Sequence, residues 1–172
     1  MTFLSWLENS AFSIWFRGET GFAWAYPIVL FLHTVGLALL VGANMTIALR
    51  LLGAAPRLPI APLERLYRVM LLGFWINALS GLMLLVADAT TKLTNPVFLI
   101  KMGFIAAAVI NMVWLRRRVF RGPRLEGYPI PASARTFATL AFVFWIGAIS
   151  AGRLMAYLGP VSGAPGLENS LP

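Results

Sequence analysis

The stretch that decides the fold is NPVFLIKMGFIAAAVINMVWLRRR, residues 95–118. Asn95 is a typical helix cap, and Pro96 suits the first helical position because its missing N–H would be unpaired there in any case. About 20 mainly apolar residues follow, the length that a helix needs to cross the roughly 30 Å hydrocarbon core of a bilayer. Three arginines then end the apolar run. The sequence therefore predicts a transmembrane helix over 96–115 whose far end meets a charged surface.

Three more segments are long and apolar enough to cross a bilayer: 21–52, 63–87 and 134–158. Short connections rich in proline or arginine join the four segments, so successive helices should run antiparallel. We therefore expect one membrane domain, residues 1–172, with an all-α fold: a transmembrane four-helix up-down bundle. Residues 3–16 predict an N-terminal amphipathic helix, lying in the membrane interface or packed on the end of the bundle. Residues 159–172, rich in Gly, Pro and Ser, predict a loose tail.

The composition limits the classes of protein to which this chain can belong. Of its 172 residues 59% are hydrophobic and 12% are charged, and a soluble domain usually carries about twice that charged fraction. The chain has no cysteine, which excludes disulfides, thiolate metal sites and iron–sulfur clusters. It also lacks a phosphate-binding glycine loop after a strand, a metal-ligand pair on a helix and a nucleophile elbow. We therefore do not expect enzyme activity from this chain alone.

The charges are distributed unevenly between the two ends of the predicted bundle. Ten arginines lie in or beside the first and third connections against two glutamates, so this side carries a net charge of +8. These residues are Arg50, Arg57, Arg65, Arg68, Arg116, Arg117, Arg118, Arg121, Arg124 and Arg135, with Glu64 and Glu126. The other side is neutral, with Arg17, Lys92, Lys101 and Arg153 against Glu8, Glu19, Asp88 and Glu168. Because basic loops remain in the cytoplasm, the N-terminus and the C-terminus should both lie outside it.

The same asymmetry explains the excess of basic residues without nucleic acid. The run Arg116-Arg117-Arg118 serves as a topology signal and is expected to contact lipid headgroups. No soluble, aromatic-rich surface accompanies it, so we expect no nucleic-acid partner. The first charge in the chain is Glu8, so the N-terminus lacks the basic start of a signal peptide, and we expect it to be retained.

Ionisable residues inside a membrane are costly and often mark a site. Four of them come from four different predicted segments and fall in the outer half of the bundle: His33, Asp88, Lys101 and Arg153. Helical spacing puts further polar residues at similar depth. These are Asn77, Ser80 and, near the outer end, Tyr157. We expect these side chains to form a polar cluster.

Several interpretations of this cluster remain open. In a purely structural one, Asp88 pairs with Arg153 or Lys101, and His33 hydrogen-bonds a neighbouring helix. In a second, the cluster binds a cofactor, haem b or a quinone. His33 would then ligate iron, and Arg153 and Lys101 would hold the haem propionates, with Asn77 nearby. Because the chain has one histidine, a sixth ligand would be Met83, a histidine of a second copy, or absent.

Two further interpretations concern transport and assembly. The outer cluster could be the vestibule of a small-anion or proton pathway, but the inner half offers only Asn44 and Asn111 as polar residues at depth. Alternatively, the chain is a membrane anchor that binds a membrane or periplasmic partner or a second copy of itself. The small residues Ala38 and Gly42, and Gly147 and Ala151, favour close helix packing, either with such a partner or, as we expect, within the bundle.

Three stretches together resemble a bacterial family of small four-helix inner-membrane proteins of unknown function. They are Tyr26-Pro27 before HTVGLALLVG (33–42), NPVF (95–98) followed by Lys101, and GRLMAY (152–157). The resemblance spans nearly the whole chain and implies a bacterial inner membrane, with no established activity or cofactor. The histidine in the first long segment also gives a more distant likeness to cytochrome-b-type four-helix bundles, from which the lack of paired histidines departs.

Overall fold

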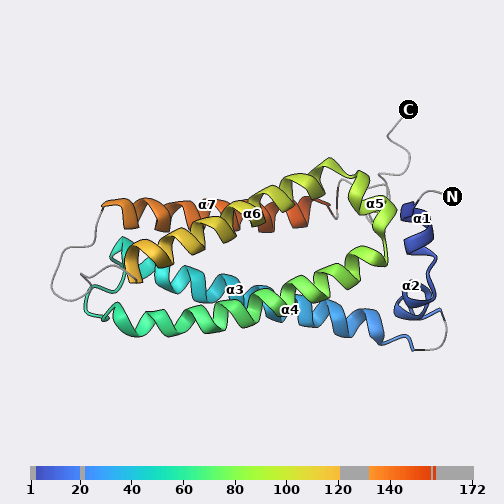
Figure 1. Ribbon diagram of the computed structural model, residues 1–172, viewed down its shortest axis with the longest axis horizontal. Helices are drawn as coiled ribbons and strands as arrows, with labels where there is room; N and C mark the ends of the chain where they lie inside the picture. Colours follow the sequence, from blue (N-terminus) through green and yellow to red (C-terminus); the bar gives the residue numbers. More distant parts are fainter. Residues whose placement is uncertain (1–2, 20–21, 121–131, 156, 158–172) are drawn as a thin grey trace.

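The computed structural model describes residues 3–19, 22–120, 132–155 and 157, and within these residues every regular element is a helix (Figure 1). The long helices are α3 (Ala25–Leu52), α4 (Leu66–Val86), α6 (Pro96–Leu115) and α7 (Ala132–Met155). The shorter helices are α1 (Phe3–Glu8), α2 (Ala11–Phe16), α5 (Ala89–Thr94), the 3₁₀ helix η1 (Ala61–Arg65) and the π-helical turn η2 (Arg116–Phe120). The fold is all-α, as the sequence predicts.

The long helices have the length and composition of membrane spans, and the chain is a multi-pass membrane protein on this criterion. Only 22% to 28% of the most apolar window of each span is buried inside the protein. Large apolar side chains such as Leu72, Trp75 and Ile100 are more than half exposed. A surface of this kind is stable in hydrocarbon and would aggregate in water.

The long helices form two hairpins that share one core. α3 packs along α4, α6 packs along α7, and α3 also packs against α7. Figure 1 shows the connection between α3 and α4, together with the end of α6 and the start of α7, at one end of the molecule, here called the inner end. It shows α1, α2 and α5 at the opposite, outer end. The main core lies in the inner half and joins all four long helices through Ile47, Met70, Leu115 and Trp145.

A smaller core closes the outer end of the first hairpin. Phe16 of α2 is fully buried there against Ala25 and Val29 of α3 and Leu84 of α4. This core contains no residue of α6 or α7 among the described residues. The outer halves of the two hairpins are therefore not joined by a common apolar core.

The N-terminal region differs from the single helix expected over 3–16. The chain forms two helices, because the side chain of Ser10 accepts a hydrogen bond from the backbone N–H of Ser13 and thereby caps a new helix. Phe16 packs α2 onto the end of the first hairpin, whereas Phe3, Trp6 and Trp15 remain exposed. α2 therefore packs on the end of the bundle. The exposed aromatic residues suit a membrane interface.

Other boundaries differ by a few residues, and one element was not expected. α3 begins at Ala25 rather than 21, α4 is preceded by η1, and α7 begins at Ala132 rather than 134. The segment between Asp88 and Asn95, predicted as a plain connection, contains the helix α5. α6 has the bounds 96–115 that the sequence predicts, with Asn95 accepting from the N–H of Val97. The predicted tail, 159–172, lies outside the described residues.

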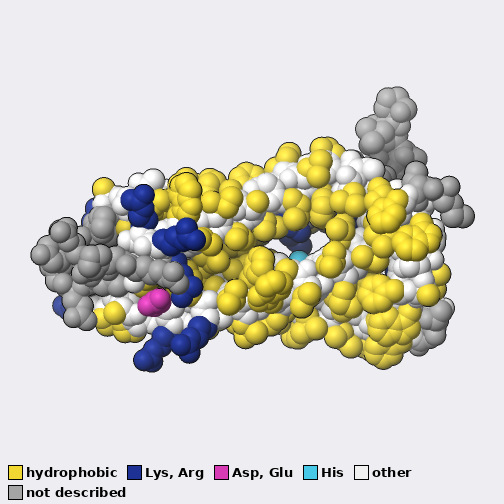
Figure 2. Space-filling view, viewed as in Figure 1, with side chains coloured by type: hydrophobic (Ala, Val, Ile, Leu, Met, Phe, Trp, Pro, Cys, Tyr) yellow, Lys and Arg dark blue, Asp and Glu magenta, His cyan; other side chains and the backbone are white. Residues whose placement is uncertain are grey.

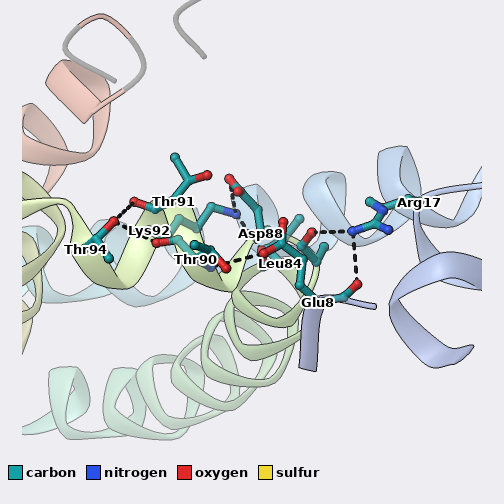
Figure 3. Close-up of polar contacts among 9 residues, drawn as sticks. Glu8, Arg17, Leu84, Asp88, Thr90, Thr91, Lys92 and Thr94 are labelled. Carbon is teal, nitrogen blue, oxygen red and sulfur yellow. Dashed lines mark hydrogen bonds and ion pairs between the residues drawn. The ribbon is translucent and has the colours of Figure 1, made fainter. Parts of the chain in front are cut away.

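Two basic residues cap the outer end of α4, where helix carbonyls would otherwise be unpaired (Figure 3). Lys92 of α5 donates to the carbonyl of Leu84, and Arg17 donates to the carbonyl of Ala87 at 3.2 Å. Glu8 of α1 accepts from the N–H of Thr90 at 3.3 Å. The short helices are thereby tied to the first hairpin by polar contacts as well as by Phe16.

Candidate binding site between the two hairpins

His33 lies on α3, and its ring is oriented by α4. Its Nδ1 is 3.0 Å from the backbone oxygen of Asn77 and 3.1 Å from Oγ of Ser80. The Ser80 hydroxyl donates to the carbonyl of Ile76, so both neighbours of Nδ1 act as acceptors. Nδ1 must therefore carry a proton, and the lone pair of the neutral ring is on Nε2.

The Nε2 atom has weaker contacts than Nδ1. The side-chain amide nitrogen of Asn77 lies 3.5 Å from it, at the outer limit of a hydrogen bond. The same amide donates a good bond, 2.8 Å, to the backbone oxygen of His33. An imidazole held through Nδ1–H by a carbonyl, with its lone pair on Nε2, is the usual state of a metal-ligating histidine.

Glycines bring α3 and α4 close enough for these contacts. A Cβ atom on Gly36 would lie 2.6 Å from the backbone nitrogen of Asn77, and one on Gly73 would lie 2.6 Å from that of Leu40. A Cβ on Gly81 would lie 3.0 Å from Cε1 of His33. The two backbones therefore nearly touch at Gly36 and Gly73, and the imidazole rests on the bare backbone of Gly81.

The second hairpin carries Lys101 opposite this histidine. The Lys101 side chain runs along Gly152 of α7, with its Cε 3.5 Å from the position of a Cβ on that glycine. Lys101 is partly buried and makes no hydrogen bond or ion pair with any other described residue. It is close enough for its charge to act on His33. An unpaired ammonium group at this depth calls for an anionic or electron-rich partner.

A hollow separates the two hairpins in the outer half of the molecule, and we call the space between His33 and Lys101 the outer hollow. Figure 2 shows an opening between the hairpins, with histidine atoms at one edge and a basic side chain at the other. The opening lies where the main core has ended and the small outer core includes only the first hairpin. Its walls are α3 and α4 on one side and α6 and α7 on the other.

Three other predicted site residues are Asp88, Tyr157 and Arg153. Asp88 and Tyr157 lie at the outer end rather than in the hollow. Asp88 pairs with Lys92 at 3.8 Å, so its predicted pairing with Arg153 or Lys101 is wrong: α5 supplies a nearer cation one helical turn away. Tyr157 is 53% exposed, and Arg153 is exposed and makes no polar contact with another described residue.

Met83 does not join His33 in the structure. Its side chain packs against the small outer core around Phe16 and Leu84. The role of sixth haem ligand therefore has no support from the position of Met83. The sequence already indicated that Met83 lies on a different face of α4 from Asn77. It follows Asn77 by six residues, which at 100° per residue places it about 240° around the helix from Asn77.

The inner half contains no polar path from the hollow within the described residues. Asn44 and Asn111 are both buried in the main core, where Asn111 donates to the backbone oxygen of Phe137 at 3.0 Å. Apolar side chains surround them on all four long helices. Among the described residues, the polar side chains of the hollow therefore do not continue into the inner half.

The small-residue pairs have different roles in the structure. Gly147 packs within the bundle, because a Cβ there would lie 2.6 Å from the ring of Phe104. Ala38 and Gly42 are exposed, and a Cβ on Gly42 would meet nothing within 4 Å. The expectation of packing within the bundle is therefore right for Gly147 and wrong for Gly42.

Lys92 is the residue of this region that sequence reasoning missed. It was counted only as a charge, yet it caps α4 by donating to the carbonyl of Leu84. Burial lowers the pKa of Lys92, and Asp88 and Glu8 oppose that shift. Its spacing of four residues from Asp88 would have predicted a helical ion pair.

The side chains identified at the outer hollow are the imidazole of His33 and the ammonium group of Lys101. Within the described residues no group of three or more His, Cys, Asp or Glu side chains comes together. Haem iron needs only one or two axial ligands from the protein.

No protein-family model, no curated protein and no solved structure matches this chain.

Proposed function

We propose that this chain is a membrane subunit that binds a b-type haem in the outer hollow, with Nε2 of His33 as the axial ligand. The observation that carries the proposal is the orientation of the imidazole, whose Nδ1 is taken up by Asn77 and Ser80 while Nε2 keeps its lone pair. Bound haem would supply one-electron redox chemistry. The residues of the chain would hold the ring and balance the charge of its propionates.

Lys101 supports the same ligand from the opposite hairpin. Haem propionates are carboxylates that need cations in a membrane, and Lys101 is an unpaired cation beside the hollow. Arg153, in the last turn of α7, offers a second cation nearer the outer surface. The chain has one histidine, so His33 would be the one imidazole that it offers to hold a haem.

A quinone is the second candidate, and the position of Met83 favours it. With Met83 in the outer core, no second axial ligand from this chain is in view among the described residues. A quinone needs no axial ligand: Lys101 would donate to one of its carbonyl oxygens, and Nε2 of His33 would accept from the hydroxyl of the reduced form. A hollow between two hairpins in a bilayer also admits a ligand from the lipid.

We further propose that the protein resides in a bacterial inner membrane with both termini outside the cytoplasm. The four helices long and apolar enough to cross a bilayer support the membrane, and the net charge of +8 at the inner end supports the orientation. The alternatives are transport of a small anion or proton and a purely structural anchor. The apolar inner core counts against the first.

An absorption spectrum of detergent-purified protein from haem-sufficient cells tests the proposal. We expect a Soret band near full occupancy, lost in His33→Ala and kept in Thr34→Ala. Thr34 is a matched control because it is the next residue on α3 and bonds only the carbonyl of Leu30. A colourless, folded wild-type preparation would refute haem binding. Solvent extraction of the same sample then tests the second candidate, which predicts a stoichiometric quinone that Lys101→Met loses.

A further inference from the structure

A second site, unrelated to the outer hollow, lies at the inner end of the molecule. A cavity of about 360 Å³ opens between η1, the first turns of α4 and the junction of α6 with η2. Its lining includes Glu64, Arg65, Tyr67, Arg68, Leu71 and Arg116. Figure 2 shows basic side chains gathered around acidic atoms at this end of the molecule.

The charge around the cavity is strongly positive. Three guanidinium groups face one carboxylate, that of Glu64, which lies 3.6 Å from Arg116. Arg65 and Arg68 make no hydrogen bond or ion pair with another described residue. The three arginines therefore hold two positive charges in excess, and most of their donors are open to a ligand.

Arg116 is held in place by its own surroundings. Its guanidinium lies over the ring of Tyr67, 5.2 Å from the ring centroid, in cation–π geometry. Its Nε is buried and has no hydrogen-bond partner in the described part of the chain. The contact with Tyr67 holds the Arg116 guanidinium beside the two open arginines, so an anion in the cavity would meet all three groups.

The apolar part of the cavity continues onto the lipid-facing surface. Leu71 lines the cavity and is 55% exposed. Along the same face of α4, Trp75, Leu79 and Leu82 are each more than half exposed. A cationic cavity at the membrane surface thus leads directly to an apolar stripe that runs toward the bilayer centre.

We infer that this cavity binds the phosphate of an anionic phospholipid. Arg65, Arg68 and Arg116 would donate to the phosphate oxygens, and an acyl chain would lie along Leu71 and Trp75. Guanidinium forks match phosphate geometry, and basic pockets between membrane helices at this depth hold acidic headgroups. A free phosphate ion has the same headgroup chemistry but would make no use of the apolar stripe.

The sequence predicted lipid contact for the whole run Arg116-Arg117-Arg118. In the structure only Arg116 lines the cavity, whereas Arg117 and Arg118 are exposed beside it. This difference supplies a matched control. The double variants Arg65→Gln/Arg68→Gln and Arg117→Gln/Arg118→Gln each remove two positive charges from the inner end, but only the first pair removes charges from the cavity.

Native mass spectrometry of the delipidated protein, titrated with phosphatidylglycerol or with phosphatidylcholine of the same acyl chains, tests the inference. We expect the wild type to bind one molecule of phosphatidylglycerol tightly and to bind phosphatidylcholine much more weakly. Arg65→Gln/Arg68→Gln should weaken the phosphatidylglycerol affinity about 10- to 30-fold, and Arg117→Gln/Arg118→Gln less than about threefold. If the double variant Arg65→Gln/Arg68→Gln does not fold, the single variant Arg68→Gln replaces it. We expect that variant to bind phosphatidylglycerol about fivefold more weakly than the wild type does.

Three outcomes would overturn the inference. Equal weakening by the two double variants would mean that only diffuse surface charge attracts the lipid. Equal affinity for phosphatidylcholine would mean that the acidic headgroup is not recognised. Inorganic phosphate that binds the wild type at micromolar concentration and displaces the lipid would identify a soluble ion, rather than a phospholipid, as the ligand.

Discussion

At the scale of single residues, the basic side chains of the outer half lie in two kinds of environment. Lys101 remains without a polar partner beside the hollow, whereas Lys92 and Arg17 donate to carbonyls at the end of α4. Both kinds of position are costly for a cation because burial removes water from it. The capping residues recover part of that cost through hydrogen bonds, whereas Lys101 makes no such bond with another described residue.

Lys92 provides a prediction about pH. Its folded-state pKa lies below the ordinary value of 10.5, so between the two values the unfolded chain binds more protons and stability rises with pH. In Lys92→Met the part of this rise that Lys92 contributes should be absent. Thermal unfolding midpoints in detergent, measured from pH 8 to 10.5, should therefore climb less in the variant than in the wild type. Parallel curves would show that Lys92 is as hydrated as in the unfolded chain.

At the scale of elements, the crossing of α3 and α4 decides where the histidine lies. Gly36 and Gly73 let the two backbones approach until the ring of His33 reaches the carbonyl of Asn77. In membranes, where water does not drive helices together, such close packing supplies much of the association energy. The site residues on the first hairpin are therefore positioned by glycines that carry no chemistry of their own.

This crossing gives a second prediction. In Gly36→Ala the new Cβ would lie 2.6 Å from a backbone nitrogen, so the helices must separate at a cost of about 1–3 kcal/mol. Gly42→Ala is the matched control, since nothing lies within 4 Å of that position. The unfolding midpoint should fall in Gly36→Ala and stay level or rise in Gly42→Ala. A level midpoint for Gly36→Ala would mean that the crossing is looser than described.

At the scale of the whole molecule, two sites lie at opposite ends of one bundle. The outer hollow contains the histidine and an unpaired lysine, and the inner cavity contains three arginines. The main core separates them with packed apolar side chains. If the arginine-rich end faces the cytoplasm, the proposed cofactor lies near the outer surface and the lipid site lies in the inner leaflet.

The orientation can be tested directly because the chain has no cysteine. Thr94, at the outer end, and Ala55, in the loop after α3, are both exposed. In intact cells a membrane-impermeant maleimide should label Thr94→Cys, and it should label Ala55→Cys only after the membrane is broken. The reverse pattern would contradict the orientation that the arginines predict. Labelling of both positions in intact cells would mean that the membrane is leaky. A cytoplasmic marker detects such leakage, and the cysteine-free parent gives the background labelling.

The sequence by itself determined the membrane helices, because runs of about 20 apolar residues match the thickness of the hydrocarbon core, and a chain of this size has no soluble core large enough to bury four of them. It also indicated which residues matter at depth: His33 and Lys101 stand out as polar groups in apolar helices, and both border the outer hollow. These conclusions need only local composition and helical spacing. Arg116 likewise stood out as part of a charged run.

Only the tertiary structure decided which of these residues meet. It paired Asp88 with Lys92, placed Met83 in an apolar core, and brought Arg65 and Arg68 to Arg116 from another helix. Helical spacing defines the face of each residue on its own helix, but not how neighbouring helices are rotated or how closely they approach. Those depend on side-chain packing between segments far apart in the chain, which no local pattern encodes.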